Sequence, residues 1–380
     1  MISARVVTLG CRLNHADSAR IAAFVGGSAT VVNTCAVTAE AMRDSRRAVR
    51  RAAAGGQKVI ATGCAATIDP VGFGALAEVV PNARKLDVRA YGCSPHEAAE
   101  PPPPHTRAFV PVQTGCDHAC TFCIIPQGRG PSLSRPLAEV VDEIAALAER
   151  GVREVVLTGV DLTSYATPNL GTLVASILDR VPNLPRLRLS SLDGVEIDPL
   201  LFELLTGEVR VMPHVHLSLQ SGDDLILKRM KRRHSRRDAI VLVERLKAAR
   251  PEIAIGADLI AGFPTESEAA HQANLSLVES CDVVHGHVFP YSPRPGTPAA
   301  RMPQVDPVRV RERAAELREA VGRRREVWLR SLVGTTHTVL AERDGTGHAP
   351  NFARLRLPAG TVPGELIDLA PTRLEDGMLA

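Results

Sequence analysis

Three cysteines close together in the sequence have the spacing of a reactive metal site. Cys116, Cys120 and Cys123 form a Cys-x3-Cys-x2-Cys pattern directly after a strand-like run. Most 4Fe–4S clusters take four cysteine ligands. Three ligands leave one iron with an open coordination position, which makes a metal site reactive rather than structural. The alternative is a zinc loop with His118 as fourth ligand, or redox thiols, but zinc sites favour paired Cys-x2-Cys halves.

A second set of cysteines is spread over the first part of the chain. Cys11, Cys35 and Cys64 each follow a strand-like run, and the runs are Arg5–Leu9, Ala29–Thr34 and Lys58–Thr62. Sites in parallel α/β sheets collect outside the carboxyl ends of the strands, so these thiols are expected to meet at one edge. The alternative is three unrelated core cysteines, since free cysteine is commonly buried. Cys93 and Cys281 match no ligand position and are expected to be structural.

The elements that position these cysteines divide into three predicted domains. Residues 1–98 are expected to form a small α/β domain with a parallel sheet. Residues 99–106 contain four consecutive prolines, which favour an extended, semi-rigid linker. Residues 107–325 form the central domain. Residues 326–380 contain short alternating strands separated by turn residues, a pattern typical of a small antiparallel β-barrel.

The central domain is predicted to be a partial barrel of six β/α units. Repeated β-then-α units give a parallel sheet that curls into a barrel, and six units leave one side open. The strand-like runs are Phe109–Gln113, Glu154–Thr158, Leu187–Ser190, Val215–Leu219, Ile253–Leu259 and Val283–Phe289. The helical patterns include Leu137–Arg150, Arg236–Ala249, Ser267–Glu279 and a charged helix over Pro307–Arg330.

Composition excludes several classes of protein. The net charge of +3 over 380 residues is too mild to imply nucleic acid by itself. No apolar run reaches the ~18–20 residues that span a bilayer, and the first residues lack the pattern of a secretory signal. We therefore expect a cytoplasmic protein that has no membrane partner. Disulfides are rare in that compartment, so the 8 cysteines favour metal binding.

The loop from Cys116 to Cys123 resembles the signature of the radical S-adenosylmethionine (SAM) superfamily. The resemblance implies that the open iron chelates the amino and carboxylate groups of SAM. It also implies that one electron from the reduced cluster yields a 5′-deoxyadenosyl radical, which the protein must aim at one hydrogen. In this comparison Phe122 matches the aromatic position that packs near the adenine.

The motifs around Cys11, Cys35 and Cys64 are similar to those of the methylthiotransferase branch, in which a second 4Fe–4S cluster carries or relays the inserted sulfur. This resemblance covers nearly the whole chain and includes a tail similar to the RNA-binding TRAM barrel. It implies two 4Fe–4S clusters, SAM, an electron donor such as flavodoxin or ferredoxin, and a sulfur source. The chain departs from the family in a short interval between Cys11 and Cys35, and in Gln127, where an aromatic residue is frequent.

Four more residues at predicted strand ends are candidate SAM contacts. Gly159 and Asp161 end the second barrel strand, where backbone groups can reach the SAM amino group. Gln220 ends the fourth strand and is a candidate for ribose hydrogen bonds, and Gly262 after the fifth permits close backbone approach. Each alone is typical of an ordinary strand-to-helix turn. Their common position at strand ends favours a site.

Basic segments bear on the substrate, because methylthiotransferases act on a tRNA base or on a ribosomal protein. Residues 228–237, which include Arg232 and Arg233, are dense in positive charge, as are residues 43–51 and 323–325. One such run is ordinarily a solvated face. Three runs in a nearly neutral chain leave basic patches suited to phosphates. A base in an anticodon loop would be splayed into the open side of the barrel.

Residues 287–298, HVFPYSPRPGTP, closely resemble the subgroup that modifies N6-threonylcarbamoyladenosine beside the anticodon. This resemblance predicts methylthiolation at C2 of adenosine 37, with Arg294 paired with the substrate carboxylate. The alternatives are the same chemistry on isopentenyl-adenosine tRNA or on a ribosomal-protein aspartate. An alternative from another class is a noncatalytic, zinc-dependent RNA-binding module.

Overall fold

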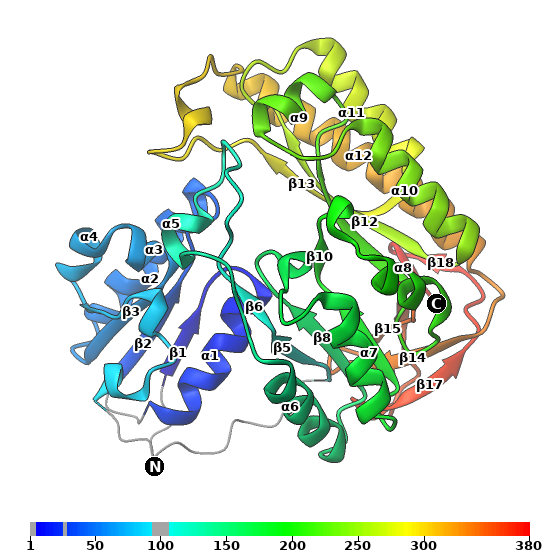
Figure 1. The fold of residues 1–380 in the computed structure, drawn as a ribbon, viewed down its shortest axis with the longest axis horizontal. Helices are drawn as coiled ribbons and strands as arrows, with labels where there is room; N and C mark the ends of the chain where they lie inside the picture. Colours follow the sequence, from blue (N-terminus) through cyan, green and yellow to red (C-terminus); the bar gives the residue numbers. More distant parts are fainter. Residues whose placement is uncertain (1–4, 26–28, 93–105) are drawn as a thin grey trace.

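The computed structural model describes residues 5–25, 29–92 and 106–380 (Figure 1). Most of the predicted linker at 99–106, and Cys93, lie outside these residues. Within the described ranges, no helix combines the length and the apolar character that crossing a membrane would require.

The first domain is a parallel sheet with helices on both faces, as the sequence predicts. Its strand order is β1-β2-β3-β4. Alternate side chains pack on opposite faces: Val31 lies in one core cluster with Ile21, and Val32 lies in another with Val49. The elements are β1 (Arg5–Thr8), α1 (Arg12–Phe24), β2 (Ala29–Thr34), α2 (Ala39–Ala53), β3 (Lys58–Gly63), α3 (Cys64–Ile68), α4 (Pro70–Gly74), β4 (Glu78–Val79), η1 (Asn82–Arg84) and η2 (Val88–Tyr91).

The central domain confirms the predicted run of parallel strands, which follow one another in chain order. One sheet has the order β5-β8-β9 and the next has the order β10-β11-β12-β13. A parallel bridge between Leu187 and Val211 connects the two. The strands are β5 (Ala108–Pro111), β6 (Gln113–Thr114), β7 (Leu133–Ser134), β8 (Glu154–Thr158), β9 (Arg186–Leu189), β10 (Ser191–Leu192), β11 (His214–Gln220), β12 (Ala254–Ala261) and β13 (Val283–Pro290).

Helices cover the outside of this curved sheet, and its open side faces the first domain (Figure 1). Helix α1 packs against β5, and α12 packs along β13 and α11. The helices are α5 (Ile125–Arg129), α6 (Leu137–Glu149), η4 (Leu162–Ser164), α7 (Leu170–Arg180), η5 (Gly194–Glu196), α8 (Pro199–Gly207), α9 (Asp224–Met230), α10 (Arg236–Ala249), α11 (Glu268–Ser280), η6 (Pro298–Arg301) and α12 (Pro307–Ser331). The outcome is a partial barrel whose missing units leave room for the first domain.

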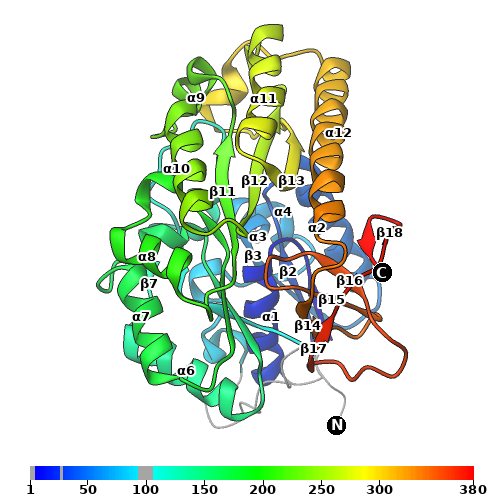
Figure 2. The same ribbon diagram turned by 90° about the vertical axis from the view of Figure 1, so that its right-hand side faces the viewer.

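The tail forms a six-stranded sheet in the order β17-β14-β15-β16-β19-β18. Its pairs are antiparallel except β16 with β19, which is parallel. Figure 2 shows the tail at the lower end of α12. The strands are β14 (His337–Ala341), β15 (Thr346–His348), β16 (Arg354–Arg356), β17 (Leu366–Leu369), β18 (Leu374–Glu375) and β19 (Met378–Leu379).

A buried ionic cluster attaches the tail to the end of the barrel where the strands begin. Arg188 on β9 donates to the carbonyl oxygens of Ala349 and Pro350 at 2.8 and 2.7 Å. The fully buried Glu154 carboxylate lies 2.9 Å from the Nε atoms of both Arg107 and Arg188. The cysteine loop follows β6 at the opposite end of the barrel. The tail therefore closes the floor of the barrel and leaves the carboxyl ends of its strands open for chemistry.

Candidate active site

The loop that carries Cys116, Cys120 and Cys123 lies at the carboxyl end of the barrel. The Cys116 thiol is 3.6 Å from Asp161 Oδ2, and the His118 backbone N–H donates to the Cys116 sulfur at 3.4 Å. The Nη1 of Arg232 donates to the Cys120 sulfur at 3.7 Å. Polar groups from the loops after β8 and α9 therefore converge on these thiols.

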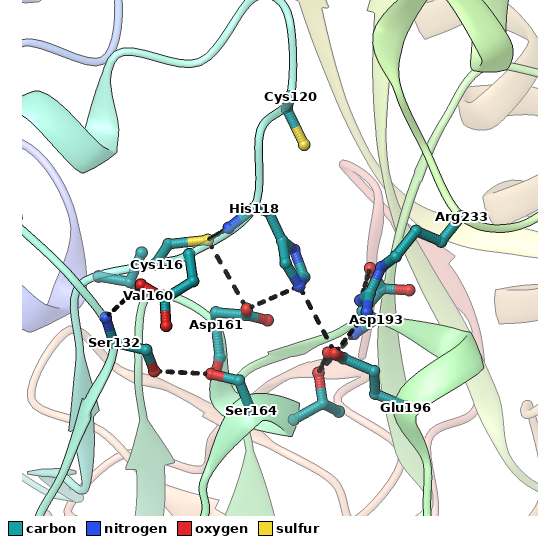
Figure 3. A network of polar contacts seen from close by, with 12 residues as sticks. Cys116, His118, Cys120, Ser132, Val160, Asp161, Ser164, Asp193, Glu196 and Arg233 are labelled. Carbon is teal, nitrogen blue, oxygen red and sulfur yellow. Dashed lines mark hydrogen bonds and ion pairs between the residues drawn. The ribbon is translucent and has the colours of Figure 1, made fainter.

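The His118 ring is held by acidic groups, and one of its nitrogens lies within 4.8 Å of both the Cys116 sulfur and an Asp161 oxygen. Its Nε2 lies 3.3 Å from Asp161 Oδ2 and 3.5 Å from Glu196 Oε1 (Figure 3). The Arg233 guanidinium binds the same Glu196 carboxylate at 2.8 Å and Asp193 at 3.2 Å. Figure 3 shows Cys120 higher on the loop, with its sulfur apart from this network. The arrangement differs from the paired ligands of a zinc loop.

The three thiols of this loop form a donor set that requires positive charge. Burial, together with smaller contributions from the Asp161 carboxylate and the other two thiols, raises the pKa of Cys116 to about 12. Burial also raises the pKa of Cys123 to about 11. Every cysteine within the described residues is a free thiol. Three adjacent thiolates at neutral pH are stable only beside metal charge, so these residues fit a 4Fe–4S cluster.

The thiols of Cys11, Cys35 and Cys64 meet at one edge of the first sheet and line one cavity. Burial raises the pKa of Cys35, and the charges of Cys11 and Cys64 raise it further. Gly10 has φ +90°, and a Cβ at that position would lie 2.5 Å from the Cys35 sulfur. Only glycine permits the loop after β1 to approach Cys35 this closely. This second donor set also fits a cluster, by the same charge argument.

Buried polar groups beside this second set were not predicted from the sequence. Arg129, at the end of α5, donates to Asn14 Oδ1 at 2.7 Å and lies 3.6 Å from Asp17. Burial lowers the pKa of Arg129, but the charges of Cys64 and Asp17 outweigh that effect and raise it. The buried Lys85 ammonium pairs with the same Asp17 carboxylate. These cations stabilise negative charge at the thiols.

Helix α5 connects the two cysteine sets. It begins directly after the loop of Cys123 and packs against α3, whose first residue is Cys64. A Cβ at Gly128 would lie 3.0 Å from the Cys64 Cβ, and the Gly128 carbonyl accepts a hydrogen bond from Asn82 Nδ2 at 2.9 Å. The chain that leaves the first cysteine set therefore contacts the second directly. No local pattern in the sequence marked this contact.

The predicted SAM contacts lie around the same end of the barrel but differ in their surroundings. The backbone N–H groups of Val160 and Asp161 donate to Gln113 Oε1 at 3.0 and 2.9 Å, which fixes the turn that contains Gly159. Gln220 ends β11 with φ +65°. In the turn at Gly159, the Asp161 carbonyl also accepts from the backbone N–H and the Oγ of Ser164, at 3.0 and 2.8 Å.

Two other predicted SAM contacts make close packing contacts. Phe122 packs edge-on against Phe263, with ring centroids 6.3 Å apart. A Cβ at Gly262 would lie 2.6 Å from Val310 Cγ2 on α12, so the close approach that glycine permits here is to this helix. Phe122 therefore anchors the cysteine loop to an apolar cluster next to β12.

The predicted substrate arginines Arg232 and Arg294 each donate a hydrogen bond to another group of the protein. Arg232 is buried and donates to Asp193 Oδ2 at 3.0 Å, in addition to its contact with Cys120. Arg294 is also buried, and its guanidinium donates to the carbonyl oxygen of Ala36, the residue after Cys35. The structure thus brings Arg232 to the first cysteine set and Arg294 to the boundary with the first domain.

A cavity of about 850 Å³ runs from the second cysteine set into the barrel. Its upper lining includes Cys11, Cys35, Cys64 and the turn at Gly159. Its lower lining includes the tail residue Phe352, which stacks on His214 with ring centroids 5.1 Å apart. Ligand pockets in proteins have volumes of ~300–1,000 Å³. This cavity is therefore large enough for a modified nucleoside, and the second cysteine set lies at one end of it.

Family comparisons agree with this architecture. The model described as "Radical SAM superfamily" matches residues 110–277, and "Uncharacterized protein family UPF0004" matches residues 3–82. A relative from Rickettsia prowazekii, named threonylcarbamoyladenosine tRNA methylthiotransferase MtaB, is 39% identical over 98% of this chain and 96% of its own. The chain belongs to the radical SAM methylthiotransferases. It is a transferase that uses SAM and 4Fe–4S clusters, for which the chain has two donor sets.

Other similar proteins place this radical SAM methylthiotransferase among its relatives. A threonylcarbamoyladenosine tRNA methylthiotransferase MtaB from Thermotoga maritima is 32% identical over 90% of this chain and 87% of its own length.

 A tRNA-2-methylthio-N(6)-dimethylallyladenosine synthase from Roseobacter denitrificans is 41% identical over 63% of this chain and 55% of its own. The solved structure of the radical SAM methyltransferase TsrM from Kitasatospora setae has a TM-score of 0.54 at 18% identity, covering 74% of this chain and 67% of that one. This last likeness shows the fold alone.

Proposed function

We propose that this methylthiotransferase converts N6-threonylcarbamoyladenosine at position 37 of tRNA into its 2-methylthio derivative. The observation that carries the proposal is the single cavity, which is lined at one end by Cys11, Cys35 and Cys64 and continues into the barrel. Sulfur insertion needs the sulfur source and the target carbon in one enclosed space. The full-length similarity to two proteins named for threonylcarbamoyladenosine supports this substrate.

The two cysteine sets have separate roles in this proposal. Bound clusters supply one-electron cleavage of SAM at the first set and hold the sulfur to be transferred at the second. The protein holds each set of thiols as thiolates, keeps water away and orients the substrate. Lys85 and Arg129 stabilise the charge of the second set. The proposed ligands are Cys116, Cys120 and Cys123 for the first cluster, and Cys11, Cys35 and Cys64 for the second.

SAM is proposed to bind at the carboxyl ends of the barrel strands, above the cavity. The carbonyl groups near Gly159 would accept from its amino group, and Asp161 and Gln220 would bind its polar groups. Phe122 and Gly262 would shape the apolar side of the site, in keeping with their contacts to Phe263 and Val310. The support is their common position beside the first cysteine set.

Exposed arginines on α2 are proposed to bind the tRNA backbone. Arg43, Arg50 and Arg51 are exposed and have no ion pair within the described part of the chain. Arg232, whose side chain is 7% exposed, and Arg233, whose side chain is 45% exposed, are both paired with Asp193, so their charges are already partnered within the protein. Free guanidinium groups on one helix suit phosphates, because each contact releases condensed counterions. The proposed partners are the tRNA anticodon loop, an electron donor such as flavodoxin or ferredoxin, and a sulfur source, all in the cytoplasm.

The proposed domain arrangement assigns one task to each unit. Residues 1–98 would hold the second cluster, residues 107–325 would bind SAM, and residues 326–380 would close the barrel floor and contact RNA, with residues 99–106 as linker. Helix α12 continues past residue 325 to Ser331, so the last two units share one helix. This shared helix supports a fixed tail rather than a freely moving one.

The experiment that tests the function uses anaerobically reconstituted enzyme with SAM, reductant and sulfide. Matched anticodon stem-loops carry threonylcarbamoyl-adenosine, isopentenyl-adenosine or unmodified adenosine at position 37, and the nucleosides are read by mass spectrometry. We expect the 2-methylthio product from the threonylcarbamoyl substrate. A product from the isopentenyl substrate alone would move the chain to the second subgroup, and zinc without iron in the purified protein would favour the RNA-binding alternative.

A further inference from the structure

The lower half of the cavity contains a positive charge that has no counter-ion. Arg325 on α12 lines the cavity, and its Nε is buried without a hydrogen-bond partner. Within the described residues, no carboxylate forms an ion pair with Arg325. Burial lowers the pKa of Arg325, and the neighbouring Arg354 guanidinium from the tail lowers it further. The Arg325 side chain is half-buried, and a partly desolvated charge without a counter-ion is costly, which indicates that an anion completes this site.

The rest of the lining supplies no such anion. The sole acidic residue among the residues that line the cavity is Asp258. Its Oδ1 already lies 2.9 Å from His216 Nε2 and 3.2 Å from His287 Nδ1. Arg354 is bound by Asp344 at 2.7 Å. The lining therefore leaves the Arg325 guanidinium free to bind an anion that enters the cavity.

A second arginine on the same helix faces the same space. Arg318 precedes Arg325 by two helical turns, lines the cavity, and donates only to the Val288 carbonyl oxygen, at 3.3 Å. Residues seven apart lie on one face of a helix, so both guanidinium groups face the strands of the barrel. Two guanidinium groups without carboxylate partners, on one wall of the same cavity, suit a carboxylate ligand.

The chemistry of the substrate places a carboxylate in this region. If adenine C2 faces the cysteine end of the cavity, the substituent on N6 diverges from that end, because C2 and C6 lie in meta positions of the ring. The threonylcarbamoyl group on N6 ends in a free carboxylate. A backbone phosphate is less suited to the site, since the polynucleotide chain would have to enter the barrel with it.

We propose that Arg325, assisted by Arg318, binds the carboxylate of the amino-acid substituent on the target adenosine. This inference rests on the proposed function and adds the residues that select the substrate. An isopentenyl group would leave the half-buried Arg325 and the exposed Arg318 without an anionic partner, and a site built to bind a polar group rejects the analogue that lacks it. Arg325 is thus a specificity-determining residue, and α12 carries the determinant.

The test compares substrates and variants in the complete reconstituted enzyme. Two anticodon stem-loops carry threonylcarbamoyl-adenosine as the free acid or as its methyl ester. They are used with wild-type enzyme, Arg325→Met, Arg325→Lys, and Arg323→Met as matched control. Arg323 is exposed on the same helix and pairs with Glu319 at 2.7 Å. The readout is kcat/KM for the 2-methylthio product, resolved into kcat and KM.

We expect the kcat/KM of wild type to be roughly 10- to 100-fold higher for the acid than for the ester, which is the factor expected for one hydrogen bond to a charged group. Arg325→Met should lower kcat/KM for the acid by a similar factor, mainly through KM, and leave the ester rate nearly unchanged. Arg325→Lys should recover part of the preference, and Arg323→Met should resemble wild type.

Other outcomes would overturn the inference without affecting the proposed function. Equal use of acid and ester by wild type would exclude a carboxylate contact, and this arm does not depend on the folding of any variant. Equal losses on both substrates in Arg325→Met would indicate a phosphate contact or a structural role. By contrast, failure of wild type to act on the acid while acting on isopentenyl-adenosine would reject the proposed function together with the inference.

Discussion

The attachment of the tail to the barrel floor depends on one buried carboxylate. Glu154 is fully buried, and its oxygens lie 2.9 Å from Arg107 Nε, 2.9 Å from Arg188 Nε and 3.5 Å from Arg186 Nη1. Glu154→Gln keeps the shape of the side chain but leaves three guanidinium groups without their shared counter-ion. We therefore expect this variant to lose stability at the junction between barrel and tail.

The expected loss of stability in Glu154→Gln is large because the arginines that contact Glu154 are buried. Arg186 and Arg188 have side chains only 4% exposed, so solvent does not replace the lost carboxylate. Breaking a buried ion pair on one side costs about 3–5 kcal/mol. This corresponds to a change of roughly a hundred- to several-thousand-fold in the folding equilibrium. The matched control is Glu319→Gln, whose exposed pair with Arg323 should be worth less than about 1 kcal/mol.

The pH dependence of stability gives a second signature of Glu154. Burial raises the pKa of Glu154, but the charges of Arg188, Arg107 and Arg186 outweigh that effect and lower it. A lowered folded-state pKa contributes stability that is present above the unfolded pKa of about 4.3 and is lost as pH falls through the folded value. The difference between wild type and Glu154→Gln should thus be largest near neutral pH and shrink below about pH 4.

The chain has a natural reporter for this measurement. Trp328 is its single tryptophan, packs with the tail core, and lies 5.0 Å from the His285 ring between centroids. Urea titration followed by Trp328 fluorescence gives the unfolding free energy at the junction. A loss in Glu154→Gln no larger than in Glu319→Gln, or a difference that does not depend on pH, would refute the reasoning.

The remaining predictions concern the cysteines and the RNA surface. Cys120→Ala should abolish SAM-dependent 5′-deoxyadenosine formation, measured by liquid chromatography; retained formation would contradict its assignment. Cys35→Ala should abolish the 2-methylthio product in the same reactions but leave measurable SAM cleavage, and loss of both would argue against separate roles. Replacing Arg43, Arg50 and Arg51 by Gln should weaken tRNA binding, measured by filter binding. The salt dependence of binding should fall by the equivalent of about two to three phosphate contacts. An unchanged affinity and salt dependence would contradict the proposed RNA surface.

Strands and helices with clear periodicity were predictable from the sequence. The runs at Ala29–Thr34 and Glu154–Thr158 and the helix at Arg236–Ala249 have the predicted bounds. Buried strands of parallel sheets are almost continuously apolar, which makes them visible in the sequence. The shortest elements were missed, because β6, β7 and β10 have two residues each and carry no period.

Contacts between distant parts of the chain were not predictable in the same way. Lys85 and Arg129 lie beside Cys64 only because α5 docks on α3, and neither has a local pattern that marks it. Arg325 was counted in a basic run near the tail, yet it lines the cavity. The sequence reports the charge of such residues, while their partners depend on tertiary packing.

The most direct test of the account is the iron content of two triple variants. One replaces Cys116, Cys120 and Cys123 by alanine, and the other replaces Cys11, Cys35 and Cys64. After anaerobic reconstitution, wild type should contain about eight irons per chain and each variant about four, because each set would hold its own four-iron cluster. A variant that retains the wild-type content, or one that loses all its iron, would contradict two independent clusters.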